Sequence, residues 1–252
     1  MKQAPLWFAL SIALSSPLAL AKSKTPAAVA APANVLSAKE KTAGWKLLFD
    51  GKTTKGWRAF KNAPFPADHW VASDGLLKCV GGKKVTDIVT DDQFDSFEFA
   101  WEWRISAAGN SGVKYLVDEA MSPRPNDGIG FEYQILDDEK HPDAKHGKDG
   151  NRTAGSLYDL VPAAKDKPLH PVGEWNESRI LVDGNHVEHW LNGAKVVSYE
   201  RGSAEMKTRI AESKYKDIKG FGEVTKGHLL LQDHDNEVAF RNLKIRAIAK
   251  KK

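Results

Sequence analysis

Residues 94–105 constrain the fold of this chain most strongly, because large apolar side chains occupy every second position. Successive side chains of a β-strand point to opposite faces, so this spacing places all of the large apolar groups on one face. Those groups are Phe97, Phe99, Trp101, Trp103 and Ile105. The pattern predicts a long strand with one face in a core.

Most of the remaining chain also predicts short strands separated by turns. Asp74-Gly75 and Asn192-Gly193, each between two apolar runs, are typical of tight hairpins. We expect further strands at 45–49, 70–72, 76–80, 111–117, 131–136, 179–182, 185–191, 195–199, 228–232 and 238–245, and one helix at 206–214. Strands at this spacing without alternating helices predict an all-β fold. The expected architecture is an antiparallel two-sheet jelly-roll sandwich with its one short helix on a connection.

The two ends of the chain differ in composition from its middle. A positive Lys2, an apolar run at 6–14 and an Ala-x-Ala site ending at Ala21 predict a signal peptide at residues 1–21, and hence a periplasmic or secreted protein. Residues 22–41, rich in Ala, Pro and Lys, predict a flexible linker. We expect a single β-sandwich domain at 42–248 and a basic tail at 249–252.

Charge and cysteine content exclude several classes of protein. A formal net charge of +4 is too mild to indicate a nucleic-acid partner. The run at 6–14 is too short to span a bilayer, and no later segment approaches a membrane span. Cys79 is the only cysteine, which excludes an intramolecular disulfide, and we expect it to be a small buried residue rather than a nucleophile. The sequence does not determine the oligomeric state.

Polar residues repeat on one face of three predicted strands. Glu132 and Gln134 are poor core residues, yet they stand side by side on the strand at 131–136. We expect them to line a groove together with Lys114 and with residues of the other two strands, which are Glu102, Arg104, His228, Gln232 and His234. For any single residue the alternative is a solvated sheet face with cross-strand pairs such as Glu–Arg.

The segment 186–189 contains two histidines and a glutamate, which resembles a metal site. On a strand, however, His186 and Glu188 share a face and His189 points away from them. The helical spacing that lets two histidines bind one zinc ion is absent. A structural role or a role in the groove is therefore expected for these residues.

Short motifs recur in a fixed order along the chain. They are LFDGK at 48–52, GW at 56–57, NSGVKY at 110–115, EYQILDD at 132–138, GSLYDL at 155–160, GEWN at 173–176, VEHWLNG at 187–193, LQDH at 231–234 and FRN at 240–242. Over about residues 43–246 the chain resembles the 3-keto-disaccharide hydrolase domain family. One departure is Asp235, where the family pattern has a glycine after the histidine.

The resemblance implies a concanavalin A-like jelly roll that cleaves glycosides already oxidised to a ketone at sugar carbon 3. Such a ketone acidifies the neighbouring C2 proton. A base can then remove that proton, and the enolate expels the group on C1. The enzyme must supply the base and a group that stabilises the enolate oxygen.

Roles for the polar residues follow from this chemistry as a hypothesis. Glu132 or His234 is the base, and Lys114, Arg104 or a bound divalent cation stabilises the enolate. Glu102 is the acid or a metal ligand. The residues expected to hold sugar hydroxyls or to stack on the ring are Asn110, Gln134, Asp137, Gln232, Tyr158 and Trp175. No other cofactor is expected, and the partner is a glycoside or oligosaccharide.

Two other functions fit the same features. A non-catalytic carbohydrate-binding module would use the same fold and groove. A direct glycoside hydrolase of this fold would carry an Asp between Glu98 and Glu102, where this chain has Ala100. The long polar loop at 137–154 and the several ionisable residues favour an enzyme.

Overall fold

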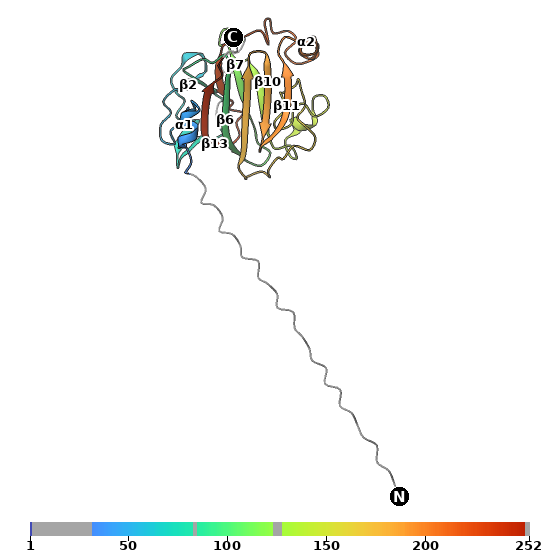
Figure 1. Ribbon diagram of the computed structural model, residues 1–252. Coiled ribbons are helices and arrows are strands. Elements are labelled where there is room, and N and C mark those ends of the chain that lie inside the picture. The colour runs from blue at the N-terminus through green and yellow to red at the C-terminus, as the bar shows by residue number, and fades with distance from the viewer. Residues whose placement is uncertain (2–31, 83–84, 123–127, 250–252) are drawn as a thin grey trace. The chain divides into compact units, whose positions relative to one another are not determined.

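The structure, a computed structural model, describes residues 1, 32–82, 85–122 and 128–249 (Figure 1). Contacts within the chain divide it into two units, Met1–Ala31 and Pro32–Lys252, and both sheets belong to the second unit. The predicted signal peptide lies, apart from Met1, outside the described residues, as do residues 250–252 of the predicted basic tail. Among the described residues, no helix is both long enough and apolar enough to cross a bilayer.

Two antiparallel sheets form the domain, as the sequence predicts (Figure 1). The larger sheet has the order β11-β10-β9-β6-β13-β4-β3, with β1 also paired to β13. Its strands are β1 (Lys46–Leu47), β3 (Trp70–Ser73), β4 (Leu76–Cys79), β6 (Phe97–Ile105), β9 (Asn176–Asp183), β10 (His186–Leu191), β11 (Ala194–Glu200) and β13 (Val238–Ala247).

The smaller sheet carries the residues that matter most for function. Its order is β2-β5-β12-β7-β8. The strands are β2 (Trp57–Ala59), β5 (Ile88–Thr90), β7 (Asn110–Val117), β8 (Phe131–Leu136) and β12 (His228–Leu231). Among the described residues, helix α1 (Ala38–Thr42) precedes the first strand, and the other helical segments lie on connections. These are α2 (Ala204–Ala211) and the 3₁₀ turns η1 (Phe60–Asn62) and η2 (Pro142–Lys145). The two-sheet jelly-roll sandwich is thereby confirmed.

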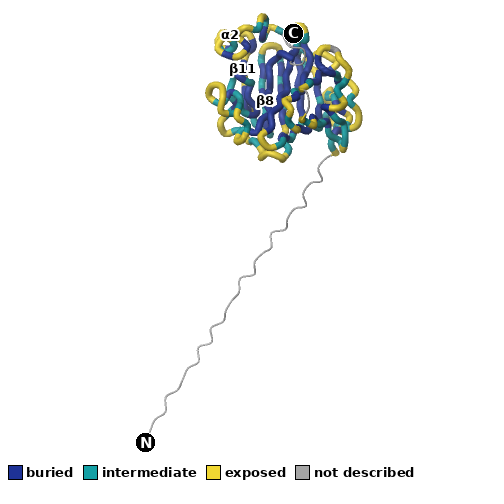
Figure 2. Tube along the Cα trace, turned by 180° about the vertical axis from the view of Figure 1, so that it is seen from behind, coloured by how far each residue is buried: buried dark blue, intermediate teal, exposed yellow. Residues whose placement is uncertain are grey.

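The core lies between the two sheets. The apolar face of β6 is almost completely buried, and it meets alternate residues of β7 and β8 such as Tyr115, Tyr133 and Ile135. Trp101 of the larger sheet packs edge-on against Tyr133 of the smaller one, with ring centroids 5.0 Å apart. In Figure 2 the strands are buried, whereas the exposed segments are connections and α2.

One histidine lies inside this core. His189 is fully buried, accepts a hydrogen bond from the Tyr115 hydroxyl at Nε2 (2.9 Å) and donates from Nδ1 to the Gly155 carbonyl (3.0 Å). Burial lowers the pKa of His189 to about 4, so the ring is neutral at pH 7. On the opposite face His186 and Glu188 contact each other at 3.3 Å, as the strand pattern predicts.

Cys79 lies at the end of β4 and is fully buried. In the register of the sheet it stands between Trp70 of β3 and Val238 of β13. Desolvation raises the pKa of its thiol well above the ordinary value. The prediction of a small buried residue is confirmed.

The N-terminal end of the folded unit differs from the prediction. Residues 32–41 were expected within a flexible linker, but Asn34 donates to the Gly75 carbonyl (2.8 Å) and accepts from the Asn242 backbone N–H (2.8 Å). Helix α1 follows, with a capping box between Ser37 and Glu40. The expectation of flexibility is wrong for residues 32–41, because a few specific hydrogen bonds hold a segment whose composition lacks apolar residues for a core.

Candidate functional site

The candidate site begins on the face of the smaller sheet that points away from the core. Lys114 of β7 stands opposite Glu132 of β8, and Gly112 stands opposite Gln134. Beyond the end of β12, Gln232 donates its backbone N–H to the Gly112 carbonyl (2.9 Å). Because directly paired residues share a face, these polar side chains form one continuous floor.

Three polar atoms of this floor are buried without a hydrogen-bond partner among the described residues. They are Glu132 Oε2, Gln134 Oε1 and Gln232 Oε1. Glu132 and Gln134 as whole residues are only 3% and 1% exposed. Leaving a buried acceptor unsatisfied costs about 1–3 kcal/mol, and more for a charged group. Such a concentration of unpaired acceptors is typical of a site that is completed by a ligand.

Gly112 makes room for the Glu132 carboxylate. A Cβ atom at Gly112 would lie only 2.5 Å from Glu132 Oε1. The glutamate side chain therefore lies across the space that any other residue at position 112 would fill. This places the carboxylate over β7, next to Lys114 and Gln232.

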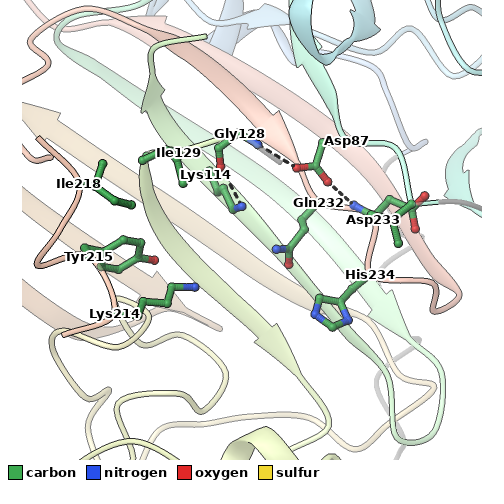
Figure 3. A pocket seen from close by; sticks show the side chains of 12 residues that line it. Asp87, Lys114, Gly128, Ile129, Lys214, Tyr215, Ile218, Gln232, Asp233 and His234 are labelled. Atoms are coloured by element: carbon green, nitrogen blue, oxygen red, sulfur yellow. Dashed lines mark hydrogen bonds between the residues drawn. The ribbon is translucent and has the colours of Figure 1, made fainter. Parts of the chain in front are cut away.

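A cavity of about 360 Å³ lies above the part of this floor that Lys114 and Gln232 form (Figure 3). Lys114 lines it and donates from Nζ to the Gly128 carbonyl (2.9 Å). In Figure 3 the Lys214 ammonium, the Gln232 amide and the His234 ring point into one common space. The other lining residues are Val85, Asp87, Gly128, Ile129, Gly130, Tyr215, Ile218 and Asp233. The size and the mixed apolar and polar lining are those of a small-molecule site.

Tyr158 flanks the floor on the side away from Lys114. Its backbone N–H donates to the Glu132 carbonyl (2.9 Å), so Tyr158 stands beside Glu132 in the same layer. The Tyr158 hydroxyl donates to Asp143 (2.7 Å), and the Lys214 ammonium lies 4.0 Å from the centre of its ring. The order across the site is therefore Lys114, Glu132, Tyr158, with Lys214 over Tyr158.

The loop at 137–154 supplies the residues that hold Tyr158 in position. Arg152 donates to Asp143 (2.9 Å) and to Asp159 (2.7 Å). Burial and the bond to Asp143 raise the pKa of Tyr158 above its ordinary range, so its hydroxyl keeps its proton. The long loop predicted to be functional thus helps to build the site.

A pair of histidines stands at the mouth of the site. The rings of His141 and His234 are nearly perpendicular, with centroids 6.2 Å apart. Partial burial and the nearby His234 lower the pKa of His141. Sequence reasoning did not identify His141, Asp87 or Lys214, because each lies on a connection where no periodicity marks it.

Three predicted site residues lie elsewhere. Glu102 and Arg104 belong to β6 in the larger sheet, and Trp175 lies beside them, so they are on the outer face opposite the site. Glu102 binds Arg241, its cross-strand partner, at 2.7 Å, and the Arg241 guanidinium covers the Trp175 ring at 4.0 Å. The expectation that they share the groove is wrong, because alternation identifies a face of a strand but not its sheet.

Two further predicted residues have different positions. Asn110 is in the site, where its side-chain oxygen accepts from Gln134 Nε2 (3.4 Å). Asp137 instead accepts from the backbone N–H groups of three loop residues, which are Ala108, Glu139 and Lys140. Its carboxylate anchors the start of the long loop, and the predicted contact with a sugar hydroxyl stays a prediction.

A divalent cation needs several side-chain ligands that converge on one point. Among the described residues, no three His, Cys, Asp or Glu side chains converge in a way that would hold a metal ion. The donor set therefore does not fit a metal held by protein ligands alone, and no chemical step below is assigned to one.

Comparison with known proteins shows the family to which this chain is similar. The chain matches the 3-keto-alpha-glucoside-1,2-lyase-like domain family over residues 44–246. It is 35% identical over 231 residues to the 3-keto-disaccharide hydrolase of Bacteroides thetaiotaomicron, which covers 81% of this chain and 79% of that protein.

Two crystal structures from Parabacteroides distasonis ATCC 8503, both classed as candidate glycosyl hydrolases, share the fold. One has a TM-score of 0.77 and 36% identity, over 86% of this chain and 100% of that one. The other has a TM-score of 0.62 and 28% identity, over 81% and 99%. Since the family match spans most of the chain, this protein belongs to the carbohydrate-active 3-keto-alpha-glucoside-1,2-lyase-like family, in which its relative is a 3-keto-disaccharide hydrolase.

Proposed function

We propose that this protein cleaves the glycosidic bond of 3-keto-glycosides by removing the C2 proton and eliminating the group on C1. The observation that carries the proposal is the buried Glu132 carboxylate, which has an unpartnered oxygen and stands on β8 directly opposite Lys114 of β7. A carboxylate in this state is poised to accept a proton, and an adjacent cation favours the negative charge that develops on the substrate.

The order of groups across the site matches the order of atoms in the substrate. With the C3 carbonyl at Lys114, the C2 proton lies over Glu132 and the C1–O bond points toward Tyr158 and Lys214. Glu132 takes the proton, the enolate oxygen is stabilised by Lys114, and the C1–O bond breaks as the C1–C2 double bond forms. Lys214 replaces Glu102 as the group that donates a proton or a hydrogen bond to the leaving oxygen.

The products follow from the balance of this step. Elimination yields an unsaturated 3-keto sugar and a free alcohol. Water added at C1 of the unsaturated sugar then completes net hydrolysis. Asn110, Gln134 and Gln232, whose amides lie on the floor, are assigned to the sugar hydroxyls.

The signal peptide predicted at residues 1–21 supports the proposal that the protein acts in the periplasm or the medium. We assign the mature N-terminus to Lys22, after the Ala-x-Ala pattern that ends at Ala21. Intact mass of the protein purified from the periplasm or the medium measures this directly. A mass that retains residues 1–21 would overturn the assignment.

Turnover of a 3-keto-disaccharide beside its unoxidised parent tests the chemistry. Only the keto form should be cleaved, and Glu132→Gln should lower kcat by about a hundredfold or more, because a lost acid–base group costs that much. His234→Ala is the comparison. If kcat falls further in His234→Ala than in Glu132→Gln, the base is His234 and not Glu132. The same turnover measured with and without a chelator shows whether a metal ion contributes to the reaction.

Two results would contradict the proposal. Cleavage of the unoxidised parent would indicate direct glycoside hydrolysis. Binding of the sugar without cleavage of either form would indicate a carbohydrate-binding module.

A further inference from the structure

Residues 155–158 lie along the outer edge of β8, the last strand of the smaller sheet. The Gly155 backbone N–H donates to the Gln134 carbonyl (2.8 Å). Further along the same edge, the Tyr158 backbone N–H donates to the Glu132 carbonyl (2.9 Å). The segment therefore pairs with the strand that carries two residues of the floor, and the positions of the segment and of the floor are coupled.

His189 fastens this segment from inside the core. Its Nδ1–H donates to the Gly155 carbonyl (3.0 Å), and its ring packs against the Tyr133 ring with centroids 4.8 Å apart. Tyr133 is the fully buried residue of β8 that stands between Glu132 and Gln134. The histidine thus contacts both the segment and the strand with which the segment pairs.

The hydrogen bonds of His189 fix the tautomer of its ring. The Gly155 carbonyl can only accept, so Nδ1 carries the proton and Nε2 of the neutral ring is an acceptor. Nε2 lies 2.9 Å from the Tyr115 hydroxyl, which in turn lies 2.8 Å from the Tyr199 hydroxyl. All of these side chains are buried, so a lost partner would leave a polar group unsatisfied.

We propose that His189 is a positioning residue, which acts through the Gly155 carbonyl to hold residues 155–158, and with them Tyr158 and Glu132, in place for the reaction. The inference rests on the proposed function, because Glu132 is the base there and Tyr158 marks the side of the leaving oxygen. His189 is fully buried and does not line the cavity, so it acts on the substrate through other residues.

The same segment also determines where Lys214 lies. Asp159 follows the segment directly, and its Oδ2 accepts from the Lys214 backbone N–H (2.8 Å). The Lys214 ammonium lies 4.0 Å from the centre of the Tyr158 ring. A shift at Gly155 would therefore displace the group assigned to the leaving oxygen as well as the base. Displacement of a reacting group by about 1 Å costs about a hundredfold in rate.

A second anchor lies just before the segment. The Ala154 backbone N–H donates to Asp138 (2.7 Å), and the Ala154 carbonyl accepts from the Lys167 ammonium (2.7 Å). The Lys167 ammonium also pairs with Asp138 (2.7 Å). These bonds keep the segment attached when the bond from His189 is lost. We therefore expect a small displacement of the segment rather than its release.

Two amide substitutions separate positioning from stability. The side-chain nitrogen of asparagine can take the place of Nδ1, so His189→Asn can keep the bond to Gly155 but loses the bond to Tyr115. The longer glutamine reaches the place of Nε2, so His189→Gln can keep the bond to Tyr115 but loses the bond to Gly155. Asparagine is smaller and leaves the larger cavity, so His189→Asn should be at least as destabilising.

His189→Gln should lower kcat for a 3-keto-disaccharide about tenfold, whereas His189→Asn should stay within about threefold of the wild type. Both rates are expressed per folded molecule, with the folded fraction taken from urea denaturation. Equal losses, a larger loss in His189→Asn, or no loss in His189→Gln overturns the inference. In each of these cases kcat would not follow the bond to Gly155.

A measurement on the wild-type protein covers the case in which a variant does not fold. The ¹⁵N chemical shifts of the His189 ring at pH 7 should place its proton on Nδ1. A proton on Nε2 overturns the inference, since the bond to Gly155 would then be absent. Wild-type protein that cleaves no 3-keto-glycoside overturns the proposed function, and the positioning role falls with it. The two failures are distinguishable, because only the first leaves the wild-type enzyme active.

Discussion

At the scale of single residues, the site depends on the absence of a Cβ atom at Gly112. Gly112 gives the Glu132 carboxylate its place on the floor, since a Cβ atom would be 2.5 Å from Glu132 Oε1. The atom that would be displaced is the end of a flexible side chain. A methyl group at position 112 should therefore move the carboxylate rather than disrupt the sheet.

Gly112→Ala should lower kcat by about a hundredfold, because displacing a reacting group by about 1 Å has that effect. The free energy of unfolding should change by no more than about 1 kcal/mol. Steady-state kinetics and urea denaturation measure the two quantities. In the double variant with Glu132→Gln the losses should not add, since both changes act on the same carboxylate. Fully additive losses would separate Gly112 from Glu132.

Alternation predicted which residues of a strand avoid the core, and this is why Glu132, Gln134 and Lys114 were found from sequence. It could not assign a strand to a sheet, and so Glu102 was placed on the wrong face of the molecule. The sequence also indicated a turn at position 235. Asp235, where the resemblance to the family pattern implies a glycine, adopts a left-handed φ of 63°.

At the scale of elements, strands were easier to predict than the segments between them. Hydrophobic periodicity marks β6 and β8 directly. The connections that carry His141 and Lys214 show no period, and hydrogen bonds that appear only in the folded chain determine their positions. Residues 32–41 could not be predicted for the same reason. Their composition indicates a linker, but one buried asparagine, Asn34, anchors the segment through hydrogen bonds.

Asn34→Gly should lower the free energy of unfolding by about 1–3 kcal/mol, because it removes two partly buried hydrogen bonds and leaves the Asn242 N–H unpaired. Glycine is the suitable replacement, since Asn34 has a positive φ of 59°. Ser37→Ala, at the exposed cap of α1, is the control and should cost about 1 kcal/mol or less. Urea denaturation compares the two. Equal small losses would show that the segment is not anchored through Asn34.

At the scale of the whole molecule, the two sheets enclose a histidine that must lose its proton to be buried. Burial lowers the pKa of His189 from 6.5 to about 4. The unfolded chain therefore binds a proton at this position before the folded chain does. The stabilisation is fully present above pH 6.5 and is lost as the pH falls through about 4.

Acidification from pH 7 to pH 4 should thus lower the free energy of unfolding by up to a few kcal/mol through His189 alone, at about 1.4 kcal/mol per unit of pKa. His189→Gln should be less stable at pH 7 but should lose less stability on acidification. Urea denaturation at several pH values measures the slopes. The same slope in the variant and the wild type would show that His189 does not control the acid response.

Burial of Cys79 has a consequence for how the protein can be made. The one sulfur that could enter a disulfide is enclosed between Trp70 and Val238, and its raised pKa keeps it a thiol. The described fold uses no cross-link that an oxidising compartment would have to form. Chains that fold in a reducing cytoplasm and chains that fold after export therefore both keep Cys79 as a thiol, and we expect neither a disulfide isomerase nor added reductant to change the yield of folded protein.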